Sequence, residues 1–261
     1  MKNQATSLRA KRGAREQARR ERDILEVARD LLARRGLSGF SMETVADEAG
    51  YSRTAIYRYY PSREELILAL AVETAELRFQ LWKPIETFAS RPRERLMAMG
   101  EVTSILYPSH VLPQVVALSN AVRGKTSAAR RRALRALDRE DHRLAIGIIQ
   151  DALEARELEL PGGLSAEELL FGIDSFVRGI FTSIASASSP ADIGVADPRR
   201  PLRVLGRELL DGIRWRPLSS EWDYGETMRR IYTELYPPEV LAPLGLAADP
   251  RTAEILRRKR P

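Results

Sequence analysis

The residues whose types and spacing favour a specific chemistry lie between positions 53 and 60. On a helix that turns 100° per residue, Ile56 and Tyr60 share one apolar face. The residues that point away from this face are Thr54, Ala55, Arg58 and Tyr59. Arg53, at the helix start, can donate two hydrogen bonds to a guanine edge, which contributes about 1 to 3 kcal/mol of base discrimination, and Ala55 can touch a thymine methyl group. The outward face is therefore a candidate surface for reading base pairs.

The helices that would position this face are short and separated by glycine. Gly36 ends a first helix, whose apolar face is formed by Ile24, Ala28, Leu31 and Leu32. Ser41 can cap a second helix that ends at Gly50, and Ser52 can cap a third that ends before Pro61. Two short helices joined in this way have the layout of a helix-turn-helix, whose second helix lies in the DNA major groove.

Helical periodicity continues through the rest of the sequence and predicts an all-α fold. Ser62 with Glu65, and Ser165 with Glu168, have the spacing of a capping box at the start of a helix. A long helix is expected over about residues 127–156. No sustained alternation of polar and β-branched residues predicts a strand.

The motif residues also resemble those of a known family. In chain order they are Gly36-Leu37, Phe40-Ser41, Val45-Ala46, Ala49-Gly50-Tyr51-Ser52, Ile56-Tyr57-Arg58-Tyr59-Tyr60 and Ser62-Arg63-Glu64-Glu65-Leu66. Over about residues 22–70 the chain resembles the TetR-type transcriptional repressors. The resemblance implies an N-terminal three-helix helix-turn-helix DNA-binding domain over residues 22–66. It further implies a C-terminal helical ligand-binding and dimerisation domain over residues 67–214, and it leaves residues 215–261 as an extension of unknown role.

Candidate phosphate contacts come from three of the four N-terminal helices. They are Ser41, Thr44, Tyr57, Tyr59 and Arg63. The two tyrosines are implied by the family pattern, as is Arg63, whose guanidinium and helix dipole would hold one phosphate together. The sequence departs from the pattern at Tyr59, where many members have histidine, and at Ile56, where leucine is usual. The alternative is that the tyrosines are core aromatics, which is the favoured interpretation for Tyr60.

Positive charge is concentrated at the N-terminus. The formal net charge is +6, and residues 1–22 carry eight lysines or arginines against two glutamates, so the remaining residues are neutral overall. We expect residues 1–21 to form a basic arm whose Arg12 and Arg15 enter the minor groove beside the recognition helix. A solvated, disordered tail is the alternative.

A single recognition helix reads few base pairs, so a homodimer is expected. The resemblance places the dimer interface on two helices, over about residues 165–187 and 201–214. A stripe of small residues at steps of three and four lies on the first of these: Gly172, Ser175, Gly179 and Ser183. Such a stripe lets a partner helix approach closely, and Leu205 and Leu209 of the second helix would add apolar surface. Packing within one chain would explain the stripe equally well.

The resemblance also implies a pocket for a small-molecule effector, whose identity the sequence does not specify. Asp141 lies on the apolar face of the long helix, where a carboxylate without a partner is energetically unfavourable. It is a candidate pocket residue, or else the partner of a neighbouring arginine. Trp82, Tyr107 and His110 lie near proline breaks and are further candidates for the edge of a cavity.

Composition excludes several classes of function. With no cysteine and two histidines, the chain cannot form disulfides, thiolate nucleophiles or zinc ribbons. The sequence lacks the G-x-S-x-G and H-E-x-x-H motifs and a glycine-rich phosphate loop, so we expect no enzyme activity, no cofactor and no metal. Without a secretory signal or an apolar run of about 18 residues, a cytoplasmic protein with no membrane contact is expected.

These observations predict a transcriptional regulator, most simply a repressor that a small-molecule effector releases from a palindromic double-stranded DNA operator. An activator, or an architectural nucleoid protein without effector control, is the alternative. An enzyme on a helical scaffold is the rival from another class.

Overall fold

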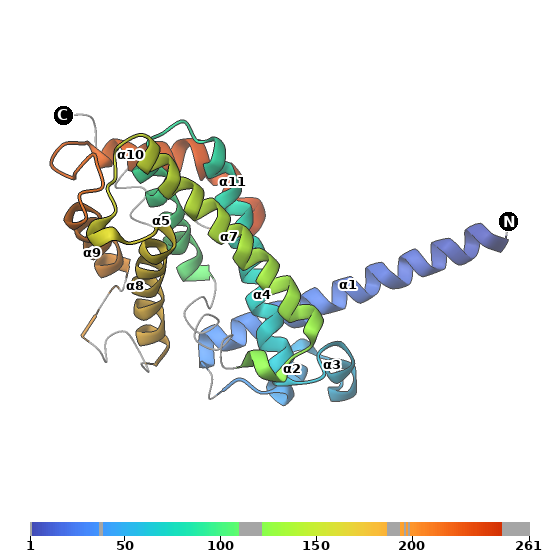
Figure 1. Cartoon of the computed structure of the whole chain (residues 1–261). Coiled ribbons are helices and arrows are strands. Elements are labelled where there is room, and N and C mark those ends of the chain that lie inside the picture. The colour runs from blue at the N-terminus through green and yellow to red at the C-terminus, as the bar shows by residue number, and fades with distance from the viewer. Residues whose placement is uncertain are drawn as a thin grey trace.

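The computed structural model describes residues 2–36, 39–109, 122–186, 194, 195, 197 and 199–246. Every regular element in this part of the chain is helical, so the predicted all-α fold is confirmed (Figure 1). None of the described helices is long and apolar enough to cross a bilayer.

The N-terminal helices have the boundaries that their capping residues favour. They are α1 (Lys2–Arg35), α2 (Met42–Ala49), α3 (Arg53–Tyr59) and α4 (Arg63–Trp82). Gly50 follows α2 with φ of 68°, a left-handed conformation that a residue with a side chain adopts at a cost. α1 is one continuous helix, so residues 2–21 of the basic segment run without a break into the motif. In Figure 1 this segment projects away from the rest of the molecule.

One apolar cluster holds these four helices together. Its fully buried members include Leu31 of α1, Val45 of α2, Ile56 of α3 and Leu66 of α4. Burying an aliphatic side chain of this size contributes roughly 1.5 to 3 kcal/mol, so the cluster fixes the orientation of α3 through its inward face.

A second cluster forms the larger part of the molecule. It is built on the C-terminal half of α4, on η1 (Lys83–Thr87), α5 (Pro92–Ser109) and α7 (Ala128–Glu154), and on α8 (Ala166–Ser186) and α9 (Arg199–Gly212). The short 3-10 helices η2 (Arg123–Lys125) and η3 (Pro161–Gly163) precede α7 and α8. α4 packs most extensively along α7, and Figure 1 shows α7 reaching from the larger body to the N-terminal helices.

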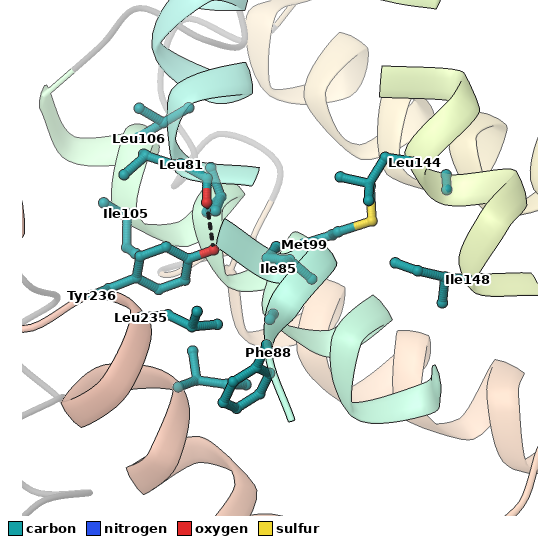
Figure 2. Packing of buried hydrophobic residues seen from close by; sticks show 14 of the residues in the cluster. Leu81, Ile85, Phe88, Met99, Ile105, Leu106, Leu144, Ile148, Leu235 and Tyr236 are labelled. Atoms are coloured by element: carbon teal, nitrogen blue, oxygen red, sulfur yellow. Dashed lines mark hydrogen bonds between the residues drawn. The ribbon is translucent and has the colours of Figure 1, made fainter. Parts of the chain in front are cut away.

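Residues 215–246 close this second core. They form α10 (Tyr224–Arg230), the π-helix η5 (Ile231–Leu235), α11 (Pro238–Leu241) and the 3-10 helix η6 (Ala242–Leu244). The Tyr236 hydroxyl donates a 2.9 Å hydrogen bond to the carbonyl oxygen of Leu81 at the end of α4 (Figure 2). Arg93 of α5, itself 1% exposed, donates to the carbonyl oxygens of Trp215 and Pro217. This part of the extension is therefore integral to the fold.

One of the two predicted capping boxes is complete, and the other is not. At α8 the Ser165 hydroxyl accepts from the Glu168 amide and the Glu168 carboxylate accepts from the Ser165 amide, at 3.1 and 2.7 Å. At α4 the Ser62 hydroxyl accepts from the Glu65 amide, but the Glu65 carboxylate turns to Ser127 and Arg130 near the start of α7. The prediction of a capping box at Ser62 was wrong because these long-range donors hold the carboxylate.

Candidate nucleic-acid interface and ligand cavity

Helix α3 presents one polar face to solvent. Its cap is the Ser52 hydroxyl, which accepts a 3.2 Å hydrogen bond from the amide of Ala55. Ile56 is fully buried, and Tyr60 just after the helix is 2% exposed. The exposed residues are Arg53, Thr54, Tyr57 and Arg58, while Ala55 and Tyr59 are half-buried. The candidate base-reading residues therefore share an accessible surface.

Tyr59 lies between two cationic side chains. Arg58 Nη2 donates to the Tyr59 hydroxyl over 3.3 Å, and the Arg58 guanidinium lies 5.2 Å from the Tyr59 ring centroid. Arg20 of α1 hydrogen-bonds to Glu16 and to Tyr59, and these bonds raise the pKa of its guanidinium. Two guanidinium groups beside one phenol form a cluster that suits a phosphate oxygen.

Tyr60 is a core residue, as predicted. Its hydroxyl donates to the carbonyl oxygen of Glu21 over 3.3 Å, and burial raises its pKa well above the usual range. The Arg130 guanidinium of α7 lies 5.0 Å from its ring centroid. Tyr60 therefore connects the end of α3 to both α1 and α7.

The candidate phosphate contacts on α2 and α4 also have structural roles. The Ser41 hydroxyl accepts from the Thr44 amide and the Thr44 hydroxyl accepts from the Ser41 amide, at 3.1 and 3.0 Å, which forms a capping box at the start of α2. The Thr44 hydroxyl also donates within this turn, to the carbonyl oxygen of Ser41. Arg63 occupies the first turn of α4 with its guanidinium 5.7 Å from the Phe40 ring centroid.

Arg12 and Arg15 are exposed on α1, well before the helix joins the N-terminal core. Further along α1, Glu16 pairs with Arg19 and Arg20 at 2.8 and 3.0 Å. The two arginines of the predicted arm therefore lie on a helix.

A cavity of about 330 Å³ lies among α4, α5, α7 and α8. Its walls are mostly apolar: the apolar side chains include Trp82, Leu96, Met99, Leu106, Leu170, Ile173, Val177 and Phe181. Cavities of this size and character accept small organic molecules.

Asp141 lines this cavity and also pairs with an arginine, so both interpretations of its position apply. It is 7% exposed, and its Oδ2 accepts from Arg78 Nε of α4 over 2.9 Å. Its Oδ1 is buried and has no hydrogen-bond partner among the described residues. Burial raises the pKa of Asp141, and the Arg78 charge opposes that rise.

The other pocket candidates have different outcomes. Trp82 lines the cavity, and its Nε1 donates to the carbonyl oxygen of Met99 over 3.1 Å. The Tyr107 side chain and His110 lie outside the described residues. Sequence reasoning missed His142 and Arg78, which also line the cavity. His142 directly follows Asp141 in the sequence and could have been considered with it as a pocket candidate. No local sequence pattern indicated Arg78.

The small residues of α8 lie away from the cavity. Gly172, Ser175, Gly179 and Ser183 are all exposed, as are Leu205 and Leu209 of α9. A Cβ atom placed on Gly179 would meet no described atom within 4 Å beyond its chain neighbours and the nearby backbone of α8. Packing within the described part of the chain therefore does not account for the stripe.

Comparisons with known proteins agree with this geometry. Residues 24–70 match the family model described as bacterial regulatory proteins, tetR family. Over 135 residues the chain is 23% identical to the HTH-type transcriptional repressor KstR2 of Mycobacterium tuberculosis, covering 52% of this chain and 67% of that protein.

Solved structures share the fold. A TetR-family transcriptional regulator from Agrobacterium tumefaciens superposes with a TM-score of 0.58 at 20% identity, covering 76% of this chain and 99% of that one. The transcriptional regulator FadR from Bacillus subtilis, solved with stearoyl-CoA, gives a TM-score of 0.52 at 16% identity, covering 73% of this chain and 98% of that one. The matched segment spans the end of α1, the helix-turn-helix and the start of α4, so this N-terminal part of the chain is similar to the tetR family of bacterial regulatory proteins.

Proposed function

We propose that this protein is a dimeric, sequence-specific DNA-binding repressor that a small organic effector releases from its operator. The observation that carries the proposal is the polar face of α3, which the N-terminal core holds exposed within the segment that matches the family. We expect Arg53 at the start of α3 to read base edges, because in a helix-turn-helix the first residues of the second helix contact the bases.

Contacts to the phosphate backbone would come from the residues around α3. They would be made by the cluster of Arg20, Arg58 and Tyr59, and by Arg63 at the N-terminus of α4. Such contacts fix the orientation of a protein on the duplex but carry no sequence information directly. Arg12 and Arg15, on the projecting part of α1, extend the positive surface beyond the motif.

A dimer with two recognition helices would bind two half-sites about 34 Å apart, or a multiple of that spacing. We assign the interface to α8 and α9, whose exposed surface includes the small-residue stripe, Phe171 at 74% exposure and Leu205 at 51%. Large apolar side chains left exposed on neighbouring elements are typical of an interaction site.

The cavity among α4, α5, α7 and α8 is the proposed effector site. It is separated from the stripe, because Ile173, Val177 and Phe181 line the cavity from the opposite face of α8. The co-crystallised stearoyl-CoA of the Bacillus subtilis regulator supports a small-molecule effector in general.

Binding of the purified full-length protein to the DNA upstream of its own gene, and to random DNA of equal length, tests the proposal at two salt concentrations. A preference of at least about 10³ for the upstream DNA that persists at the higher salt is expected. Equal binding to both DNAs, lost with salt, would instead identify an architectural protein. No binding to either DNA would reject the DNA-binding proposal.

A further inference from the structure

The charges that line the cavity are predominantly negative. Four carboxylates from two helices contribute: Asp138 and Asp141 of α7, and Glu167 and Asp174 of α8. The cations are Arg78 of α4 and Arg178 of α8, and His142 of α7 is the remaining titratable group of the lining. Cavity walls with an excess of one charge favour a ligand of the opposite charge.

Both arginines are already paired with these carboxylates. Arg78 binds Asp141 and lies 3.9 Å from Asp138, and its guanidinium lies 5.2 Å from the Trp82 ring centroid. Arg178 Nε donates to Asp174 over 2.5 Å. Each cation is therefore already partly neutralised by a carboxylate of the lining, and among the described residues Glu167 forms no ion pair, so the negative charges remain in excess.

The carboxylate of Asp141 favours a ligand that carries a hydrogen-bond donor. Its Oδ2 is occupied by Arg78, whereas its buried Oδ1 has no hydrogen-bond donor among the described residues. A buried carboxylate oxygen without a donor is destabilising, and a ligand that supplies a donor removes this cost. A protonated amine supplies both the donor and the complementary charge.

The rest of the lining is suited to an apolar body. Met99 and Leu106 of α5 and Val177 and Phe181 of α8 all line the cavity, and about 330 Å³ is enough for a bicyclic aromatic group or a short alkyl chain. We propose that the effector is an amphiphilic organic cation, an amine on an apolar body, whose ammonium group binds at Asp141. This inference rests on the proposed function, because it names the ligand class of the proposed effector site.

Three probes that share one ring system test the charge preference. They are 1-naphthylmethylamine, 1-naphthalenemethanol and 1-naphthoate, titrated into the full-length protein at pH 7 by isothermal calorimetry, with lauroyl-CoA as a fourth probe. The amine is expected to bind at least about tenfold more tightly than the alcohol, as for a hydrogen bond to a charged group, and the naphthoate more weakly still.

Two variants test whether the preference for the amine over the alcohol depends on Asp141. Asp141→Asn should reduce the amine's advantage to less than about threefold while leaving the alcohol's affinity unchanged. Asp151→Asn removes a carboxylate from the exposed part of the same helix and should change nothing in this assay. If Asp141→Asn proves unstable, the double variant Arg78→Gln/Asp141→Asn removes both partners of the ion pair and serves in its place.

Several outcomes would overturn the inference. They are no amine binding at 1 mM, tighter binding of naphthoate or lauroyl-CoA than of the amine, and an amine preference that survives loss of the Asp141 charge. Binding of ligand-free protein to its upstream DNA is measured in parallel. Its absence would reject the proposed function, whereas its presence alongside a failed amine preference would reject only the ligand class.

Discussion

The substitution Glu65→Gln tests the contact of Glu65 with Ser127 and Arg130, which joins the start of α4 to the start of α7. Glu65 is 7% exposed, and its carboxylate accepts from the Ser127 amide, from the Ser127 hydroxyl at 3.4 Å and from the Arg130 guanidinium. Glutamine keeps the shape of the side chain but removes its charge and one of its two acceptor oxygens. Arg130, whose side chain is 29% exposed, then loses its carboxylate partner beside the Tyr60 ring.

The expected cost follows from these partners. A hydrogen bond to a charged group contributes about 1.5 to 3 kcal/mol, and removing one member of a buried ion pair costs about 3 to 5 kcal/mol. Because Arg130 keeps part of its exposure to water, we expect the lower range, a loss of about 2 to 3 kcal/mol in the free energy of unfolding at pH 7. Glu64→Gln, a neighbouring change outside this network, should stay within about 0.5 kcal/mol.

The pH dependence gives a second readout. Burial raises the pKa of Glu65, but the bonds from Arg130 and Ser127 outweigh burial and hold the pKa below its ordinary value of 4.5. A carboxyl group with a lowered folded-state pKa stabilises the protein fully above its unfolded pKa, and this contribution is lost as pH falls toward the folded value. The difference between the native protein and Glu65→Gln should therefore be constant above about pH 6 and shrink below pH 4.5.

Urea unfolding followed by circular dichroism, at intervals between pH 3 and pH 7, measures both quantities. A loss below about 0.5 kcal/mol at pH 7, or a loss that Glu64→Gln reproduces, would refute the reasoning about this contact. A difference that stays constant down to pH 3 would refute the assignment of the lowered pKa.

Three further changes address the proposed function. Arg53→Ala should lower affinity for the specific site by about 1 to 3 kcal/mol and relax one base position, measured by fluorescence anisotropy with operator and random DNA; an equal loss on both would contradict base reading. Arg63→Ala should weaken binding to all sequences alike and reduce the slope of log affinity against log salt by about 1, and an unchanged slope would remove it from the phosphate contacts. Gly179→Arg should give a monomer in analytical ultracentrifugation without unfolding, since a Cβ there meets no described atom within 4 Å beyond the nearby backbone of α8. A Gly179→Arg protein that remains dimeric would place the interface elsewhere.

Local features of the fold could be predicted from the sequence because their causes lie within a few residues. Ser41 and Ser52 cap the helices that follow them, and Gly50 takes the left-handed conformation expected after α2. Ile56 and Tyr60 face inward as the helical period requires. The exposed face of α3 is the other half of that same period, so its candidate residues were predictable too.

Partners distant in sequence were not predictable. The position of Asp141 on an apolar face predicted that it needs a partner. That the partner is Arg78, 63 residues earlier in the sequence, follows only from the packing of α4 on α7. Glu65 had the spacing of a capping box, yet donors from 62 and 65 residues away hold its carboxylate. The continuity of α1 was not predicted either. The concentration of positive charge suggested that residues 1–21 form a separate arm, but positive charge by itself does not end a helix.

The two buried acidic contacts between α4 and α7 connect the proposed sites. Arg78 and Asp141 join the helices beside the cavity, whereas Glu65 and Arg130 join them beside Tyr60, which follows the recognition helix directly. Leu66 at one end of α4 is buried in the N-terminal core and Leu81 at the other end in the larger core, so α4 belongs to both. Because closely packed helices shift as units, a ligand that displaces α7 at Asp141 acts on the helix pair that supports α3. The described contacts therefore form a continuous path from the cavity to Tyr60 through α4 and α7.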